Sequence, residues 1–238
     1  MDNIGYIGLT RQSGLLQEMQ TVANNIANLS TTGYRREGVV FTEFVRRAGD
    51  GVPSISFASA GGRLTDPRQG ALTATGGRLD FAIEGDGFFL LDTPRGPRLT
   101  RAGAFTLSSE GALVNNDGYR LLDAGEAPVF VPPGAADIAL AADGTLSADG
   151  QPLALIGTFL PADPGGMIRE AGTRFRAEGG IRPAGPVRLM QGFLEASNVS
   201  PVQEMARMIE IQRAYELGQN FLDREDERIR SVVRVLGQ

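Results

Sequence analysis

The sequence predicts an α+β fold, in which long N- and C-terminal helices pack as a coiled-coil-like pair around a central all-β domain of short strands. Two observations support this prediction. Both ends of the chain repeat apolar residues at spacings of three and four, and the middle alternates short apolar runs with glycine-rich turns. We expect an N-terminal axial helix at 1–34, an extended connecting segment at 35–76, a central β domain at 77–188 and a C-terminal axial helix at 189–238.

The N-terminal helix is predicted from about Asn3 to Leu29. Its heptad seam runs through Leu15, Met19, Val22, Ile26 and Leu29, and continues upstream through Gln12, Gly8 and Gly5. Because glycine is a poor helix former, the first turns are weak in isolation. The segment from Asn28 to Gly33 is expected to end the helix, with Gly33 in the left-handed conformation.

The C-terminal helix is predicted to start at Ser200-Pro201 and to reach about Leu236. Serine at the N-cap, proline at the first helical position and Gln203 at the third are typical of a capping box. One apolar stripe follows at Met205, Met208, Gln212, Tyr215, Gln219, Leu222, Asp226, Ile229, Val233 and Leu236. A second runs beside it at Ile211, Ala214, Gly218, Phe221, Val232 and Val235.

This double stripe is wider than one partner helix covers, which favours contacts with neighbouring subunits. A plain packing of the two terminal helices on each other within one chain stays open as the alternative. Asp226 falls on the seam, where a buried charge requires a partner. The exposed side is expected to carry the charge pairs Asp226–Arg230, Glu210–Arg213 and Glu225–Arg228.

Between the helices, roughly residues 35 to 195 follow a strand-and-turn pattern. Strand-like runs occur at Leu79–Leu91, Pro97–Thr100, Leu113, Tyr119–Leu122, Val129–Val131, Leu153–Phe159 and Thr173–Arg176. Turns are expected at Gly85–Gly87, Thr93–Gly96, Asn116–Gly118, Asp143–Gly144 and Asp149–Gly150, because glycine, asparagine and aspartate tolerate positive φ. Many short strands with such turns favour a compact all-β domain.

The composition excludes most kinds of catalysis. The chain contains no cysteine, histidine or lysine, which excludes thiolate nucleophiles, serine–histidine triads and Schiff-base lysines, as well as the usual ligands of zinc. We therefore expect no enzyme, no catalytic residue, no cofactor and no metal site. Asp143 and Asp149 lack the spacing of a calcium loop, and the acidic run at 223–228 is expected to be a solvated helix face.

Charge and hydropathy restrict the partners. The net charge is −5 and the arginines form no basic stripe, so we expect no nucleic-acid partner. The apolar run Ile4–Leu9 is interrupted by glycines and preceded by Asp2, which is unlike a cleaved signal peptide. No apolar run is long enough to cross a bilayer, so no membrane insertion is expected. On these grounds alone the chain would be cytosolic.

Three segments, in order along the chain, resemble one known family. They read VANNIANLSTTGYR at 22–35, LDFAIEGDGFF at 79–89 with LTRAGAF at 99–105, and QGFLEASNVSPVQEMARMIEIQRAYELGQNFL at 191–222. These resemble the signatures of the flagellar rod and hook family of axial proteins. Within the motifs, the resemblance implies subunit-interface residues at Ala23, Asn24, Asn25, Ile26, Ala27, Asn28, Thr32, Gly33, Tyr34, Glu204, Met205, Met208, Ile209, Gln212, Arg213, Tyr215 and Leu222.

The resemblance implies a structural subunit of the flagellar basal body, and the two ends of the chain are most similar to the proximal-rod type. It implies a periplasm-spanning rod that transmits motor torque, assembled head to tail through the terminal helices, which stay largely disordered before assembly. The implied partners are other rod proteins, further copies, the rod cap and the type III export apparatus, with no cleaved signal peptide. The alternatives are a distal-rod or hook-type subunit and, in a different class, a secreted glycan-binding or glycan-cleaving β domain using Glu84, Asp86 or Asp92.

Overall fold

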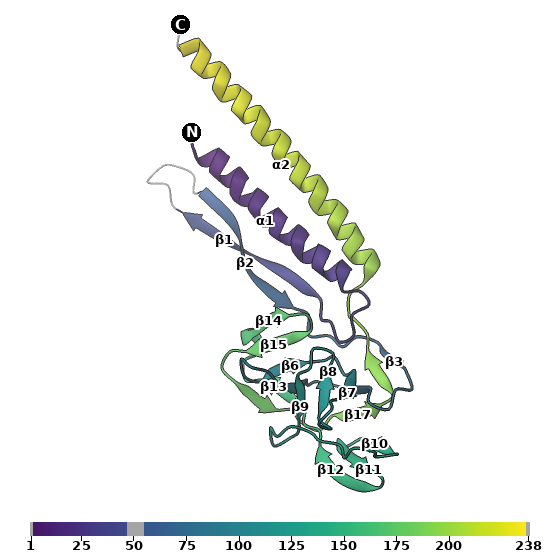
Figure 1. The fold of residues 1–238 in the computed structure, drawn as a ribbon. Coiled ribbons are helices and arrows are strands. Elements are labelled where there is room, and N and C mark those ends of the chain that lie inside the picture. Colours follow the sequence, from purple (N-terminus) through teal and green to yellow (C-terminus); the bar gives the residue numbers. More distant parts are fainter. Residues whose placement is uncertain (1, 47–54, 237–238) are drawn as a thin grey trace. The chain divides into compact units, whose positions relative to one another are not determined.

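A computed structural model of the chain describes residues 2–46 and 55–236. It divides into two compact units, drawn in Figure 1. The helical unit comprises the described parts of Met1–Ala27, Arg36–Asp66 and Ser200–Gln238, and the β unit comprises Asn28–Arg35 and Pro67–Val199. The predicted fold class is confirmed, because two packed terminal helices accompany a domain of short antiparallel strands.

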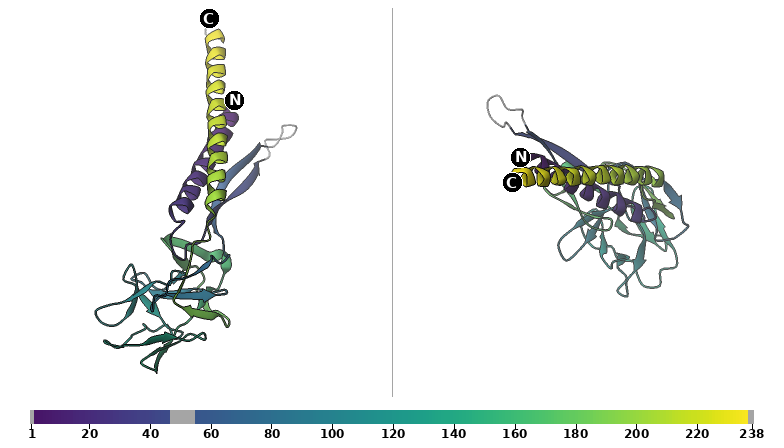
Figure 2. Two further views of the ribbon diagram at one scale, coloured as in Figure 1. Left: turned by 90° about the vertical axis from the view of Figure 1, so that its right-hand side faces the viewer. Right: turned by 90° about the horizontal axis from the view of Figure 1, so that it is seen from above.

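The helical unit contains two long helices and one hairpin. Helix α1 (Asp2–Ala27) lies antiparallel to α2 (Pro201–Leu236), so that the start of α1 lies beside the C-terminal half of α2 (Figures 1 and 2). Strands β1 (Glu37–Arg46) and β2 (Ile55–Thr65) form an antiparallel pair with a register shift between Val40 and Phe41. Helix α1 packs against both strands as well as against α2.

The helix ends follow local chemistry. Helix α1 stops at Ala27, and the next turn is closed by Thr31, whose N–H and hydroxyl both donate to Asn28. Gly33 has the predicted positive φ of 68°. The helix itself ends at Ala27, directly before the segment Asn28–Gly33 that was predicted to end it and two residues before the predicted Leu29. Helix α2 starts at Pro201 as predicted, and the Glu204 N–H donates to the Ser200 carbonyl at 3.0 Å.

Two of the three predicted charge pairs on α2 are confirmed. Arg230 lies 2.7 Å from Asp226, and the Arg228 Nε donates to Glu225 at 2.9 Å. Glu210 pairs with Arg207 on the preceding turn instead of Arg213. The seam position predicted for Asp226 was wrong, because its side chain is 57% exposed. Glu225, one position earlier, is half-buried instead.

The β unit is built from short strands. Its largest sheet has the order β14-β15-β6-β5-β9-β8-β7, and β10-β11-β12 forms a separate three-stranded sheet. Three pairs complete the unit: β13 with β16, β17 with β4, and β18 with β3. The strands are β3 Leu72–Ala74, β4 Phe81–Glu84, β5 Phe89–Asp92, β6 Arg98–Thr100, β7 Phe105–Leu107, β8 Leu113–Asn115, β9 Arg120–Leu122, β10 Ile138–Leu140, β11 Thr145–Ala148, β12 Gln151–Leu155, β13 Phe159–Pro161, β14 Met167–Ala171, β15 Arg174–Ala177, β16 Ile181–Pro183, β17 Arg188–Gln191 and β18 Phe193–Glu195. A short 3₁₀ helix, η1, occupies Pro164–Gly166.

Apolar side chains fill two clusters inside the β unit. The larger contains Phe81, Phe89 and Phe105, whose neighbouring ring centroids lie 5.6 to 5.8 Å apart. The smaller is centred on Phe175 and Phe159. The predicted turns are confirmed, with positive φ at Gly85, Gly87, Gly96, Gly118, Gly144, Asp149 and Gly150. The predicted strand at Val129–Val131 was wrong, because this segment forms isolated bridges and single backbone bonds.

Candidate functional site

The face of α2 that meets α1 has alternating spacings of four and three. Its half-buried or buried members are Glu204, Met208, Ile211, Tyr215, Gly218, Leu222 and Glu225. On α2, Ile211 is 2% exposed, and on α1, Val22 is likewise buried. The observed seam therefore takes members from both predicted stripes, which is the geometry of a heptad repeat.

Glycines bring the two helices close together at the N-terminal end of α1. A Cβ at Gly8 would lie 2.6 Å from Leu222, and one at Gly218 would lie 2.3 Å from the Gln12 amide nitrogen. That amide donates to the Tyr215 carbonyl on α2 at 2.9 Å. Small residues at these positions allow the backbones to approach, and the predicted upstream seam through Gln12 and Gly8 faces α2.

A buried polar cluster ties α1, α2 and β1 together. The Asn25 amide donates to the Glu37 carbonyl at 2.8 Å and to the Glu204 carboxylate at 3.0 Å. Arg36 contacts the same carboxylate at 2.5 Å. Glu204 is fully buried, so its charge depends on these partners. Asn25, inside α1, therefore bonds the neighbouring helix α2 directly.

A second ionic contact joins the helices further along. Arg207 on α2 lies between Glu18 on α1 and Glu210 on its own helix, with the Arg207 Nε 2.7 Å from Glu18. The hydrogen bond that Arg207 donates to Glu18 raises the pKa of Arg207 above its ordinary value, and a second bond to Glu210 adds to this. Together with Glu204, this contact defines the register between α1 and α2.

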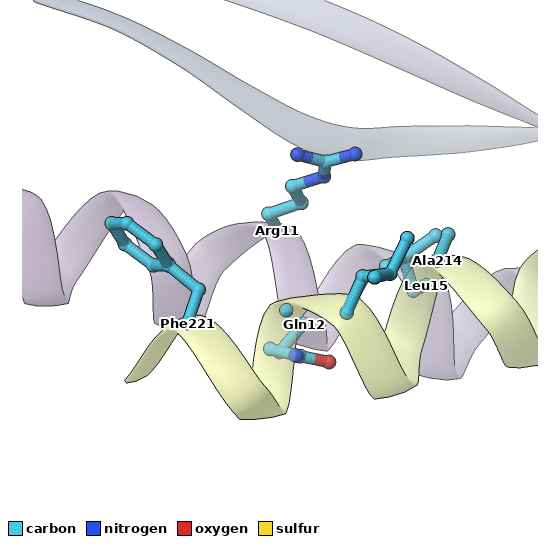
Figure 3. A pocket seen from close by; sticks show the side chains of 8 residues that line it. Arg11, Gln12, Leu15, Ala214 and Phe221 are labelled. Carbon is cyan, nitrogen blue, oxygen red and sulfur yellow. The ribbon is translucent and has the colours of Figure 1, made fainter. Parts of the chain in front are cut away.

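An apolar groove of about 460 Å³ opens along the helix pair. Its walls are Gly8, Leu15, Ala214, Leu217, Gly218 and Phe221, with Arg11 and Gln12 as the polar members. Figure 3 shows Phe221 at one end, Leu15 with Ala214 at the other, and Gln12 between them. Leu217 is 70% exposed and Phe221 52% exposed, so the groove has an unusually apolar rim for a surface in contact with water.

The β unit holds a buried ionic cluster of its own. Glu195 lies 2.7 Å from Arg35 and 3.1 Å from Arg101, and all three side chains are nearly inaccessible. Burial lowers the pKa of Arg101 to about 10, although Glu195 opposes this shift. Gly33 packs here against the Arg101–Ala102 backbone, where a Cβ would lie 2.3 Å from the Ala102 nitrogen.

The motif residues do not form one surface. Asn28, Thr32, Gly33 and Tyr34 belong to the β unit, where the Tyr34 ring lies under the Arg169 guanidinium at 4.3 Å. Asn25 and Glu204 are buried in the helical unit, and Ile26, Met208, Tyr215 and Leu222 are half-buried there. The exposed members are Ala23, Asn24, Ala27, Met205, Ile209, Gln212 and Arg213.

Sequence reasoning missed several residues that organise these clusters. Arg35, Arg36, Arg101 and Glu195 were not singled out from the sequence as members of buried ionic clusters. The available signal was Glu204 itself, because a carboxylate at a seam position of a heptad requires a cationic partner. That partner is Arg36, one of the two adjacent arginines that follow α1.

The arrangement of acidic side chains and the hydropathy of the helices bear on metal binding and on membrane insertion. Within residues 2–46 and 55–236, no group of three or more acidic side chains is placed to hold a metal ion. None of the helices described is long and apolar enough to cross a membrane. Glu84, considered above for glycan cleavage, is exposed and lies 3.5 Å from Arg188.

Models of three protein families match the chain in order. Residues 6–35 match the family described as flagella basal body rod protein. Residues 82–148 match the D1 domain of the flagellar hook protein FlgE/F/G family, and residues 190–235 match the C-terminal family of flagellar basal body rod FlgEFG proteins. The matches overlap all three segments on which the resemblance was based.

Curated relatives agree with these matches over most of the chain. The flagellar basal-body rod protein FlgF of Rhizobium meliloti is 41% identical over 89% of this chain and 88% of its own length. FlgF of Caulobacter vibrioides is 38% identical over 100% of this chain and 99% of its own. FlgG of Bacillus subtilis is 29% identical over 97% of both. The chain belongs to the FlgE, FlgF and FlgG family of flagellar basal-body rod and hook proteins, and it is a structural rod protein rather than an enzyme.

Proposed function

We propose that the chain is a proximal-rod subunit of the FlgF type that assembles head to tail through its terminal helices. The FlgF relatives reported above share 38 to 41% of aligned residues, against 29% for the FlgG relative. The rod would span the periplasm and transmit motor torque. Its subunits would reach that place through the type III export apparatus without a cleaved signal peptide, with other rod proteins and the rod cap as partners.

The observation that carries this proposal is the apolar surface left on a fully formed helix pair. Once α1 covers the seam, α2 still exposes large apolar side chains at Val202, Met205, Ile209, Leu217, Phe221, Ile229 and Val232. Contacts between subunits that do not close on themselves produce helical assemblies, and exposed stripes on long helices supply such contacts. The exposed motif residues Met205, Ile209, Gln212 and Arg213 lie on this surface of α2 and are proposed to contact neighbours.

The proposal assigns roles along the chain. Residues 1–34 and 189–238 are the axial segments, 77–188 the outer β domain and 35–76 the connection between them. The buried motif residues Asn25 and Glu204 hold α1 and α2 in register, which aligns the groove walls contributed by the two helices. The motif residues of the β unit, Gly33 and Tyr34 among them, anchor the end of the N-terminal segment.

The test is a charge placed on the groove wall. Leu217→Asp introduces a carboxylate at a side chain that is 70% exposed, so the isolated chain should keep its melting temperature and helix content. We expect swimming to be lost and the variant to be missing from purified basal bodies. Asn220→Asp adds the same charge at an exposed position on the same helix without removing an apolar side chain, and it should swim normally.

Normal swimming and normal incorporation of Leu217→Asp would contradict assembly through this surface. A second arm locates the subunit along the axis of intact basal bodies by density. A position beyond the proximal segment would contradict the FlgF assignment while leaving the rod function in place.

A further inference from the structure

The β unit contains a basic pocket that the helix contacts do not use. It encloses about 290 Å³ and is lined by Thr93, Arg95, Arg98, Tyr119, Glu170 and Arg174, among others. The turn between β5 and β6 supplies one wall, and the β14–β15 hairpin supplies another. A pocket with this lining is suited to an anion.

The carboxylates in and next to the pocket neutralise only part of its positive charge. Arg98 is 6% exposed and contacts the Glu170 carboxylate with two nitrogens, at 2.8 and 3.0 Å. Arg176 reaches the same carboxylate at 3.2 Å. Glu170 therefore serves two arginines and has little capacity for a third.

The remaining cations face the opening. Arg174 stacks over the Tyr119 ring at 4.6 Å and donates to Asp117 at 2.7 Å. Arg95 is exposed, and its guanidinium has no hydrogen-bond or ion-pair partner in the part of the chain that the structure describes. Arg176 also pairs with Glu178 at 3.0 Å, so four arginines face three carboxylates, which leaves one excess positive charge and Arg95 available to a ligand.

The same unit carries the complementary charge elsewhere. Residues 121–168 contain six carboxylates and neither arginine nor lysine. Asp137 and Asp143, which flank β10, are both exposed and form no ion pair among the described residues. Figures 1 and 2 show β14 and β15 at one end of the β unit and β10 to β12 at the other.

We propose that this basic pocket receives Asp137 or Asp143 from the β10–β12 end of a second copy of the chain. Because the donor and the acceptor lie at opposite ends of one unit, the contact is heterologous, so each copy presents both a donor and an acceptor to further copies. The inference rests on the proposed function, and it adds a polar contact between β units to the apolar contact between helices. Such a contact selects orientation and register more than it adds affinity.

The absence of cysteine from the chain makes disulfide cross-linking a clean test. Two double variants, Arg95→Cys with Asp137→Cys and Arg95→Cys with Asp143→Cys, replace the sole chromosomal copy, and basal bodies are purified and mildly oxidised. We expect at least one of them to give dimers and higher multiples of the 25.3 kDa chain. The single variants, and the matched control Arg95→Cys with Glu110→Cys, should give about tenfold less.

The outcomes separate this inference from the proposed function. If the variants are present in purified basal bodies but remain monomeric, the β-unit contact is wrong and the rod assignment stands. A cross-linked product whose mass is not a multiple of the chain means that another protein occupies the pocket, which also overturns the inference. If unmodified chain is missing from basal bodies, the proposed function itself fails.

A charge-exchange arm needs no cysteine. Arg95→Asp should reduce swimming, and adding Asp137→Arg or Asp143→Arg should restore it. The positions are exposed, so the isolated variants are expected to melt as the parent chain does. Failure of both exchanges to restore swimming, after a loss by Arg95→Asp alone, would contradict the pairing.

Discussion

The two units of this protein have opposite interiors. In the β unit the buried side chains are mainly aliphatic and aromatic, and they form two clusters built around Phe89 and Phe175. In the described part of the helical unit, Val22 and Ile211 are the buried large apolar side chains. Buried polar side chains outnumber them there: Gln12, Glu18, Thr21, Asn25, Glu37 and Glu204.

The difference indicates how each unit is stabilised. The β unit removes its own apolar surface from water, which is the main favourable contribution to folding. The helical unit uses polar contacts to hold α1 and α2 in one register, and it leaves apolar side chains such as Leu217 in solvent. Polar groups at buried positions select geometry rather than add much stability, so the helical unit is expected to gain stability from neighbours.

The largest expected effect compares one phenylalanine from each unit. Phe89→Ala removes a fully buried ring and should lower the free energy of unfolding of the β unit by about 4 kcal/mol. Phe221→Ala removes a ring that is 52% exposed. It should change the free energy of unfolding of the helical unit by less than about 0.5 kcal/mol, while swimming is reduced. Urea unfolding of both variants measures the two free energies. Equal losses of stability would show that the interiors do not differ as described.

The next effect concerns the buried carboxylate of the helical unit. Glu204→Ala leaves Asn25 and Arg36 without their shared acceptor. We expect the free energy of unfolding of the helical unit to fall by about 3 kcal/mol. This is the low end for breaking a buried charged pair, because Arg36 is 33% exposed. Helical circular dichroism during urea unfolding measures the loss. Glu210→Ala, at a side chain 67% exposed, is the control and should cost less than about 0.5 kcal/mol.

A third prediction concerns the isolated chain. Because Val22 and Ile211 are the buried large apolar side chains in the described part of the helical unit, this unit should open locally at least ten times more often than the β unit, a difference of about 1.4 kcal/mol. Limited proteolysis should therefore cut first within 1–27, 36–66 and 200–238, leaving a β-rich core that contains Pro67–Val199. Simultaneous cleavage of both units, or helical termini that resist protease at low concentration, would contradict this expectation.

The smallest effect is a pH dependence confined to the β unit. The hydrogen bond from Arg98 lowers the pKa of Glu170 below its ordinary value of 4.5. A lowered pKa favours the folded carboxylate, so its stabilisation is complete above about pH 4.5 and is lost as the pH falls through the lower folded value. When the melting temperature is measured as a function of pH, Glu170→Gln should reduce its decrease below about pH 4.5. Glu178→Gln, at the exposed partner of Arg176, should leave that decrease unchanged.

Much of the fold was accessible from local sequence signals. Pro201 after Ser200 predicted the start of α2, and glycine or aspartate–glycine pairs such as Asp149-Gly150 predicted the hairpin turns, because these depend on backbone preferences of a few residues. The wrong predictions concern features that depend on contacts between residues far apart in the sequence. Asp226 was predicted on the seam and Val129–Val131 as a strand, and each depends on which element lies alongside.

The interface was predicted less completely than the fold. The three motifs correctly indicated the rod and hook family, and the seam through Gly8 and Gln12 meets α2 as expected. The roles of Arg35 and Arg36 were not predicted, because neighbouring residues in the sequence reach different carboxylates, Glu195 and Glu204. Nothing in the local pattern distinguishes these two partners.

The sequence by itself determined the two helical ends, the strand-rich middle, the turns and the family, since these follow from periodicity, glycine placement and ordered motifs. Only the tertiary structure decided which face of α2 is covered and which is left open. It also decided that motif residues as close as Asn25 and Gly33 serve different units. The reason is physical: burial and charge pairing depend on residues far apart in the chain, as the partnership of Glu204 with Asn25 and Arg36 illustrates.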